Sequence, residues 1–331
     1  MARNISVGID WQGRLDYEAL VRRAEIADNV GVHSLWVPEA WGRDAFTLLA
    51  VLAARTRRIA LGTAIVNIFS RSPAALAQHF ATLDELSGGR MIIGLGTSGP
   101  QVIEHFHGVA FERPLVRLRE YVEIINALLR GEPLRHEGAL FRLERGFTLR
   151  FSPLRNHIPV YLATLRTKSV RLTAEIADGW LPILIPLPRL QAEILAMRRM
   201  SASAGRPPDA VRVRAPGAVV VTEDPAAARA ETARTLAFYI GRMGTFYAEQ
   251  LTRQGYGEAV RKAKAGWEGG SRAAAQAVPD DLVAAVSCAG PPAQCIERLH
   301  AQEESGVDIH TVHVQAESLR AYESALAAMV G

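Results

Sequence analysis

The sequence predicts an α/β fold of the (β/α)8 TIM-barrel class, built as a single domain over residues 1–331. Short runs of β-branched and apolar residues alternate with longer amphipathic runs, a rhythm typical of parallel sheets. Eight strand-like runs occur in 331 residues, a length that fits one large barrel. Two irregular segments, after the fourth strand and before the eighth, are expected to be insertions.

In the first half of the chain, four strand-like runs are each followed by a helical pattern. The strand runs are ISVGI, SLWV, RIALGTAIV and MIIGLG. The sequence predicts both ends of the third helix. Ser72 suits the N-cap, Pro73 the first helical position and Gly88 the C-terminal end. After the fourth helix, the polar residues 132–154 predict a β-hairpin.

The second half resumes the same alternation. Its strand runs are PVYLA, WLPILI, VRVRAPGAVVV and IHTVHV. Between the last two of these, residues of about 225–290 are rich in alanine and are expected to form an irregular helical insertion.

Composition excludes several classes of function. Lys and Arg total 38 against 34 Asp and Glu, a net charge of +4, and no run of five like charges occurs. We therefore expect neither a nucleic-acid nor a membrane partner. No apolar run reaches the length of a membrane span, so a cytoplasmic protein is expected. Cys288 and Cys295 are expected to be reduced thiols that pack as small hydrophobic groups.

The segment RMIIGLGTSGPQ contains the spacing GxGxxG between Gly94 and Gly99. A dinucleotide-binding loop would need a helix at once and then a second strand that ends in an acid. Here Pro100 follows the loop, and Glu120 lies inside a helical pattern, so that interpretation fails. In a barrel, the same glycines lie at the carboxyl end of the fourth strand, where backbone N–H groups and the hydroxyls of Thr97 and Ser98 can approach an anion.

A second polar cluster follows the fifth strand. The segment ATLRTKSVRL places hydroxyl groups and two cations just before a helix, which suits a phosphate site. An ordinary solvated helix start fits this segment equally well. A third segment, LGTAIVNIFSRSP, indicates by itself only a barrel strand and its loop.

Together, WVPEAWG, LGTAIVN…RSP, ATLDELSGGR…GLGTSGPQVIEHFHG and AEIADGWLPI resemble the bacterial luciferase-like flavin and deazaflavin oxidoreductases. Within that superfamily, the sequence is most similar to the branch dependent on coenzyme F-420. This branch includes methylenetetrahydromethanopterin reductase and F-420-dependent glucose-6-phosphate dehydrogenase. The resemblance implies a (β/α)8 barrel with the cofactor ring at its carboxyl mouth, and a homodimer.

The resemblance also implies the site. A non-prolyl cis peptide bond would join Ala64 and Ile65 behind the cofactor ring, with Glu39 near the ring and Asn67 as a polar contact. The loop beside the cofactor's side chain would consist of Gly96, Thr97, Ser98 and Gly99, and the loop that holds its phosphate of Leu165, Arg166, Lys168 and Ser169.

Two departures from the sugar-phosphate dehydrogenases matter. Those enzymes have an Asp-His pair where this chain has Glu39-Ala40, and a Glu where it has Thr97. Oxidation of glucose 6-phosphate by their mechanism is therefore not expected. The candidates for proton transfer are Glu39, His105 and His107, with Glu39 and His107 taken as the catalytic pair.

Other polar and aromatic residues are expected to be structural. Trp41 and Trp180 could line a substrate pocket, but large aromatic side chains at strand ends more often pack in the core. His310 and His313, three apart in one strand, face opposite sides and cannot form a metal pair. No metal site is expected.

The expected function is an oxidoreductase that transfers a hydride between F-420 and an organic small-molecule substrate. One alternative is an FMN-dependent luciferase-like monooxygenase that uses reduced flavin and oxygen. Another is a non-catalytic flavin-binding protein of the same fold. The helices after the second and third strands, rich in Ala and Leu, suit a homodimer interface.

Overall fold

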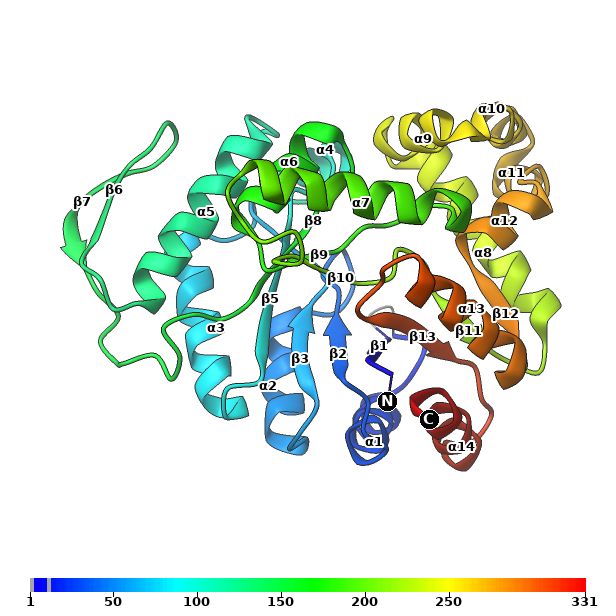
Figure 1. Ribbon diagram of the computed structural model, residues 1–331, viewed down its shortest axis with the longest axis horizontal. Coiled ribbons are helices and arrows are strands. Elements are labelled where there is room, and N and C mark those ends of the chain that lie inside the picture. Colours follow the sequence, from blue (N-terminus) through cyan, green and yellow to red (C-terminus); the bar gives the residue numbers. More distant parts are fainter. Residues whose placement is uncertain (1–2, 11–12) are drawn as a thin grey trace. The chain divides into compact units, whose positions relative to one another are not determined.

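The computed structural model describes residues 3–10 and 13–331. The chain forms two compact units (Figure 1). The N-terminal unit contains Val7–Thr164 and Arg171–Leu181, and the C-terminal unit contains Met1–Ser6, Leu165–Val170 and Pro182–Gly331. Strand β1 (Ile5–Gly8) begins in the C-terminal unit, as does helix α6 (Thr167–Ile176).

The N-terminal unit is a parallel sheet with helices packed along it, as the alternating pattern predicts. Its further strands in this sheet are β2 (Ser34–Val37), β3 (Ala60–Thr63), β4 (Val66–Asn67), β5 (Met91–Gly96), β8 (Val160–Ala163) and β9 (Gly179–Trp180). Strand β3 pairs with β2 on one side and β5 on the other, and β8 continues the sheet from β5 to β9. Its helices are α1 (Tyr17–Asn29), α2 (Ala45–Arg55), α3 (Pro73–Ser87), α4 (Pro100–His105) and α5 (Pro114–Leu129).

The expected boundaries of α3 are confirmed. The Ser72 hydroxyl accepts a hydrogen bond from Ala75 N at 3.2 Å, Pro73 occupies the first position, and Gly88 adopts the left-handed conformation with φ 69°. Burial follows one face, where Leu76, Phe80 and neighbouring apolar residues lie against the sheet.

The segment DELSGGR, which ends this helix and leads into β5, holds the start of β5 in place. Asp84 is fully buried, accepts a hydrogen bond from Met91 N, and forms an ion pair with Arg155 at 2.5 Å. Arg90 donates to the carbonyl oxygens of Ala53, Thr56 and Ile59. These contacts give the motif a structural role.

The predicted hairpin is present as β6 (Leu134–Glu137) and antiparallel β7 (Arg142–Phe147). Glu120 on α5 accepts hydrogen bonds from the backbone N–H groups of the turn, those of Ala139, Leu140 and Phe141. Burial acts to raise the pKa of Glu120, but these N–H groups bring it below its usual value. Glu120 therefore anchors the hairpin, which agrees with the rejection of a dinucleotide-binding role.

The C-terminal unit contributes parallel strands and most of the later helices. Strand β11 (Val219–Val221) pairs with both β12 (Cys288–Gly290) and β13 (His310–Val314), and β10 (Arg212–Val213) precedes them. Helix α7 (Leu187–Ser203) comes before these strands, and α13 (Pro292–Glu304) and α14 (Leu319–Val330) flank β13 along the chain. Strand β12 is missing from the sequence prediction because its three residues, CAG, carry no periodic pattern.

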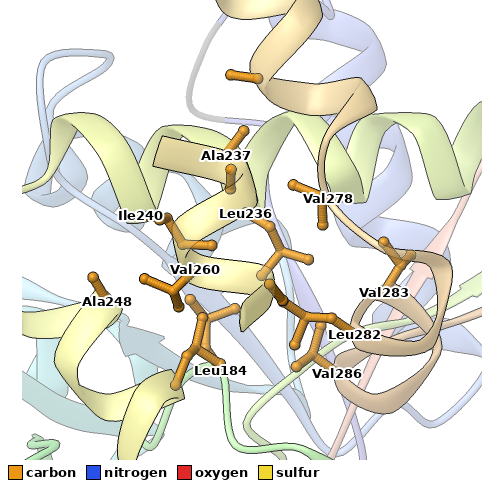
Figure 2. Close-up of a cluster of buried hydrophobic side chains, with 14 residues drawn as sticks. Leu184, Leu236, Ala237, Ile240, Ala248, Val260, Val278, Leu282, Val283 and Val286 are labelled. Carbon is orange, nitrogen blue, oxygen red and sulfur yellow. The ribbon is translucent and has the colours of Figure 1, made fainter. Parts of the chain in front are cut away.

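Helices do fill the segment of about 225–290. They are α8 (Pro225–Arg242), α9 (Phe246–Leu251), a π-helical turn (Thr252–Tyr256), α10 (Gly257–Gly266), a 3-10 turn (Trp267–Gly269), α11 (Gly270–Gln276) and α12 (Asp280–Val286). Their apolar faces meet in one core with Leu184, and this core includes Leu236, Ile240, Val260 and Leu282 (Figure 2). None of the helices within the described residues is both long and apolar enough to cross a membrane.

We expect Asp84→Asn to lower the free energy of unfolding by about 3 kcal/mol, because it leaves Arg155 without its buried partner. Urea denaturation measures this change. Glu85→Gln, an exposed neighbour on the same helix, is the matched control and should have an effect within about 0.5 kcal/mol. Equal unfolding free energies for the two variants would contradict the role given to Asp84.

Candidate functional site

The carboxyl ends of β2, β3 and β5 meet at a cis peptide bond. The bond joins Ala64 to Ile65, as the resemblance implied. Glu39 N donates to Ile65 O at 3.1 Å, and Ala64 N donates to Val37 O at 2.9 Å, so the end of β2 lies beside it. A Cβ on Gly96 would lie 3.1 Å from the Ile65 side chain, so the loop after β5 also packs against Ile65.

The first glycine of the GxGxxG segment serves strand packing. A Cβ on Gly94 would lie 1.6 Å from Thr63 O, so only glycine fits there. The Thr63 hydroxyl donates to Gly94 O at 2.7 Å and accepts from Gly94 N at 2.9 Å. Thr63 was not among the predicted site residues, although its position before Ala64 placed it at the strand end.

The rest of this loop stays partly open. Thr97 and Ser98 are half-buried, and Ser98 has φ 56°, a left-handed conformation uncommon for a residue other than glycine. The Thr97 hydroxyl donates to Ser98 O at 3.1 Å, which leaves its lone pairs to accept a hydrogen bond. Gly99 is buried and directly precedes α4.

Glu39 is held in a network of charges. Its two carboxylate oxygens accept from Arg71 at 2.5 and 3.1 Å, and one also accepts from Ala45 N at the start of α2. Arg71 binds Asp44 as well and lies over the Phe46 ring at 4.8 Å. A bidentate arginine and a helix N-terminus are both favourable partners for a carboxylate. These contacts fix the position and orientation of the Glu39 side chain.

Asn67 and His107 contact each other, which the sequence alone did not predict. Asn67 Oδ1 accepts from Phe69 N and Ser70 N, which fixes Nδ2 as the amide atom that lies 3.2 Å from His107 Nε2. Because Nδ2 can only donate, His107 Nε2 must accept. The contact therefore fits the tautomer of His107 that carries its proton on Nδ1. His105 is exposed, and no contact joins it to this group.

The predicted phosphate loop lies in the C-terminal unit at the start of α6. Arg166, Thr167 and Lys168 are exposed there. Ser169 closes the first turn, since its hydroxyl accepts from Arg166 N at 3.1 Å and donates to Arg166 O at 2.8 Å. Two cations and a hydroxyl at a helix N-terminus are chemistry that binds phosphate.

Arg166 also contacts α9, in the helical segment. Its guanidinium forms an ion pair with Glu249 and lies over the Phe246 ring at 4.5 Å. A hydrogen bond from Thr245 and the charge of Arg166 hold the pKa of Glu249 below its usual value. No motif in the sequence marks Phe246 or Glu249, because the contact joins segments about 80 residues apart.

The tryptophans and histidines that were expected to be structural make none of the contacts described above. Trp180 is 1% exposed and donates to Thr164 O, so it packs, whereas Trp41 is half exposed. His310 is buried against Gln302, and burial lowers its pKa, while His313 on the opposite face is exposed. Within the described residues, no group of three or more His, Cys, Asp or Glu side chains could hold a metal.

Comparisons with known proteins match nearly the whole chain. Residues 6–309 match the family described as luciferase-like monooxygenase. A Mycobacterium tuberculosis protein, provisionally named a coenzyme F-420-dependent oxidoreductase, is 36% identical over 305 residues, which covers 86% of this chain and 88% of that protein. A 5,10-methylenetetrahydromethanopterin reductase of Archaeoglobus fulgidus is 31% identical over 315 residues, 91% of this chain and 90% of that enzyme.

A solved structure shares the fold. The coenzyme F-420-dependent tetrahydromethanopterin reductase from Methanopyrus kandleri aligns with a TM-score of 0.81 at 23% identity, over 99% of this chain and 97% of that one.

We expect His107 to carry its proton on Nδ1 at neutral pH, because Asn67 donates to Nε2. Two-dimensional 15N–1H NMR of the imidazole ring distinguishes the tautomers. The exposed His105 serves as an internal reference in the same spectrum. A protonated Nε2 in His107 would contradict the assigned contact with Asn67.

Proposed function

The chain belongs to the luciferase-like monooxygenase family, and from that premise we propose that it is an F-420-dependent oxidoreductase that transfers a hydride between the coenzyme and an organic small-molecule substrate. The observation that carries this proposal is the relative named for F-420, which is 36% identical and aligns over 86% of the chain. We propose a single (β/α)8 barrel for the whole chain and a cytoplasmic location.

The donor groups of the chain fit the coenzyme's charges. Arg166 and Lys168 are exposed cations at the start of α6, and they would hold the phosphate with Leu165 and Ser169. The strand-end residues would lie against the ring and its side chain, namely Ala64, Ile65, Asn67, Gly96, Thr97, Ser98 and Gly99. When bound, the deazaflavin supplies two-electron hydride chemistry at its C5 atom.

The protein's own groups place charge and protons around that chemistry. Glu39 offers a carboxylate that Arg71 holds in place. His107 offers an N–H donor at Nδ1, and it can take up a proton at Nε2 only by releasing Asn67. We propose Glu39 and His107 as the groups that hold protons for the reaction, each oriented by its hydrogen-bond partner.

We further propose a homodimer in which a second copy covers α2 and α3. These helices border a groove of about 390 Å³. Leu86 at its edge is 59% exposed, and Phe46 stacks on His79 with ring centroids 4.4 Å apart. Arg71 also lines this groove, so a partner there would lie beside the residue that holds Glu39.

We expect fluorescence titration of the purified protein to give micromolar or tighter binding of F-420, and binding of FMN that is weaker by about tenfold or more.

Arg166→Met should weaken F-420 binding by about tenfold, because it removes a charged phosphate contact. Arg171→Met, an exposed cation farther along α6, is the matched control and should leave the affinity unchanged.

The reverse preference, with FMN bound more tightly, would overturn the proposed cofactor and favour a flavin monooxygenase. If Arg166→Met and Arg171→Met have equal affinities for F-420, the phosphate site lies elsewhere.

Light scattering should give the mass of two chains for the protein, and Leu86→Arg should shift it toward one chain because it places a charge in the groove. Leu195→Arg changes a leucine of similar exposure on α7 and should leave the dimer intact. A mass of one chain for the wild-type protein would contradict the proposed homodimer.

A further inference from the structure

Cys288 and Cys295 are brought together by the turn between β12 and α13, in the C-terminal unit. Cys288 is the first residue of β12, and Cys295 lies in the first turn of α13. Each thiol shifts the pKa of the other, so the two sulfurs lie near each other, and neither is in a disulfide. The Cys288 sulfur also lies 3.9 Å from the carbonyl oxygen of Gln294, the residue before Cys295. The sequence predicted only two packed thiols, whereas the structure places them on the two sides of one tight turn.

The two cysteines differ in access. Cys295 is fully buried, and its sulfur lies 3.4 Å from Gly290 O and 3.5 Å from Val220 O. Cys288 is half-buried, so a small solute can reach it. A dissolved reagent can therefore reach the Cys288 thiol, whereas the Cys295 thiol is shielded from solvent.

Arg298 adds a positive charge beside Cys288. It lies on α13, and its guanidinium donates to the carbonyl oxygens of Ala284, Ala285 and Ser287. These bonds hold the charge at the beginning of β12, and one of them goes to Ser287, the residue directly before Cys288. Cationic, partly exposed surroundings of this kind are typical of reactive cysteines.

The electrostatics favour a thiolate at Cys288. The hydrogen bond from Cys295 and the charge of Arg298 lower the pKa of Cys288 to about 6, against the opposing effects of burial and Glu297. The same pairing raises the pKa of Cys295 above its usual value. At neutral pH the negative charge therefore resides on the more accessible sulfur, and the proton on the buried one.

We propose that Cys288 and Cys295 form a peroxide-sensitive dithiol, in which Cys288 is the residue that reacts and Cys295 resolves it to a disulfide. The oxidant class is a hydroperoxide, with hydrogen peroxide as the smallest member. A low-pKa, accessible cysteine next to a second cysteine is the arrangement found in redox-responsive thiols.

The chemistry balances in two steps. The Cys288 thiolate attacks one peroxide oxygen, an S–O bond forms as the O–O bond breaks, and hydroxide leaves. The sulfur loses two electrons, which the peroxide gains, and Cys288 becomes a sulfenic acid. The Cys295 sulfur then attacks the Cys288 sulfur, an S–S bond forms as the S–O bond breaks, and the departing hydroxide takes the Cys295 proton as water.

One peptide reports the whole reaction. Trypsin releases residues 273–298, which contain both cysteines. After treatment of the intact protein with hydrogen peroxide and blocking of the remaining thiols, mass spectrometry should find this peptide lighter by two hydrogens and unblocked. Dithiothreitol should restore both thiols.

Single variants separate the two roles. In Cys295→Ser, the sulfenic acid at Cys288 cannot be resolved and should be trapped by a cyclic 1,3-dione reagent. In Cys288→Ser, the buried Cys295 should react at least about tenfold more slowly than Cys288 does. Arg298→Met should slow the reaction of Cys288, and Arg298→Lys should restore part of it, because the lysine keeps the charge.

Three results would overturn the proposal. They are the absence of a disulfide in the wild-type peptide, a Cys288→Ser variant that reacts as fast as the wild type, and a Cys295→Ser variant that yields no trapped sulfenic acid. Circular dichroism of each variant, matched to the wild type, ensures that a folded protein is compared.

Discussion

The close approach of β3 and β5 at Thr63 and Gly94 is the contact on which the candidate site depends. Only a residue without a Cβ can stand opposite Thr63 O, and the Thr63 hydroxyl then bonds to both backbone groups of Gly94. The chain leaves β3 directly into the cis peptide bond and leaves β5 into the glycine loop. The contact between the two strands thus brings the cis peptide bond and the glycine loop together, and no ligand is needed for this.

Around this contact, polar side chains hold one another in fixed positions. Arg71 orients Glu39, and Asn67 orients His107 while it also closes its own turn. Both candidate proton carriers are therefore held in place by a hydrogen-bond partner. A substrate or cofactor that displaces one of these partners would free the side chain to move, which links binding to chemistry through identifiable contacts.

Local pattern was enough for much of the fold. The alternation of strands and helices, the caps of α3 and the hairpin follow from periodicity and from residues that act within a few positions of each other. The cis bond came from the resemblance, since nothing in Ala64 and Ile65 alone predicts it. The motif DELSGGR, part of one of the segments that carry the resemblance, secures β5 through Asp84 and Arg90.

Long-range contacts explain what the sequence did not predict. The pairs Asn67–His107 and Arg166–Glu249, and the contact of Cys288 with Cys295, depend on how turns bring side chains together. The most direct test of the central claim is a crystal structure of the protein with F-420. We predict that the deazaflavin ring lies against the Ala64–Ile65 peptide, beside the loop of Gly96–Gly99. A ring bound away from these residues would contradict the account.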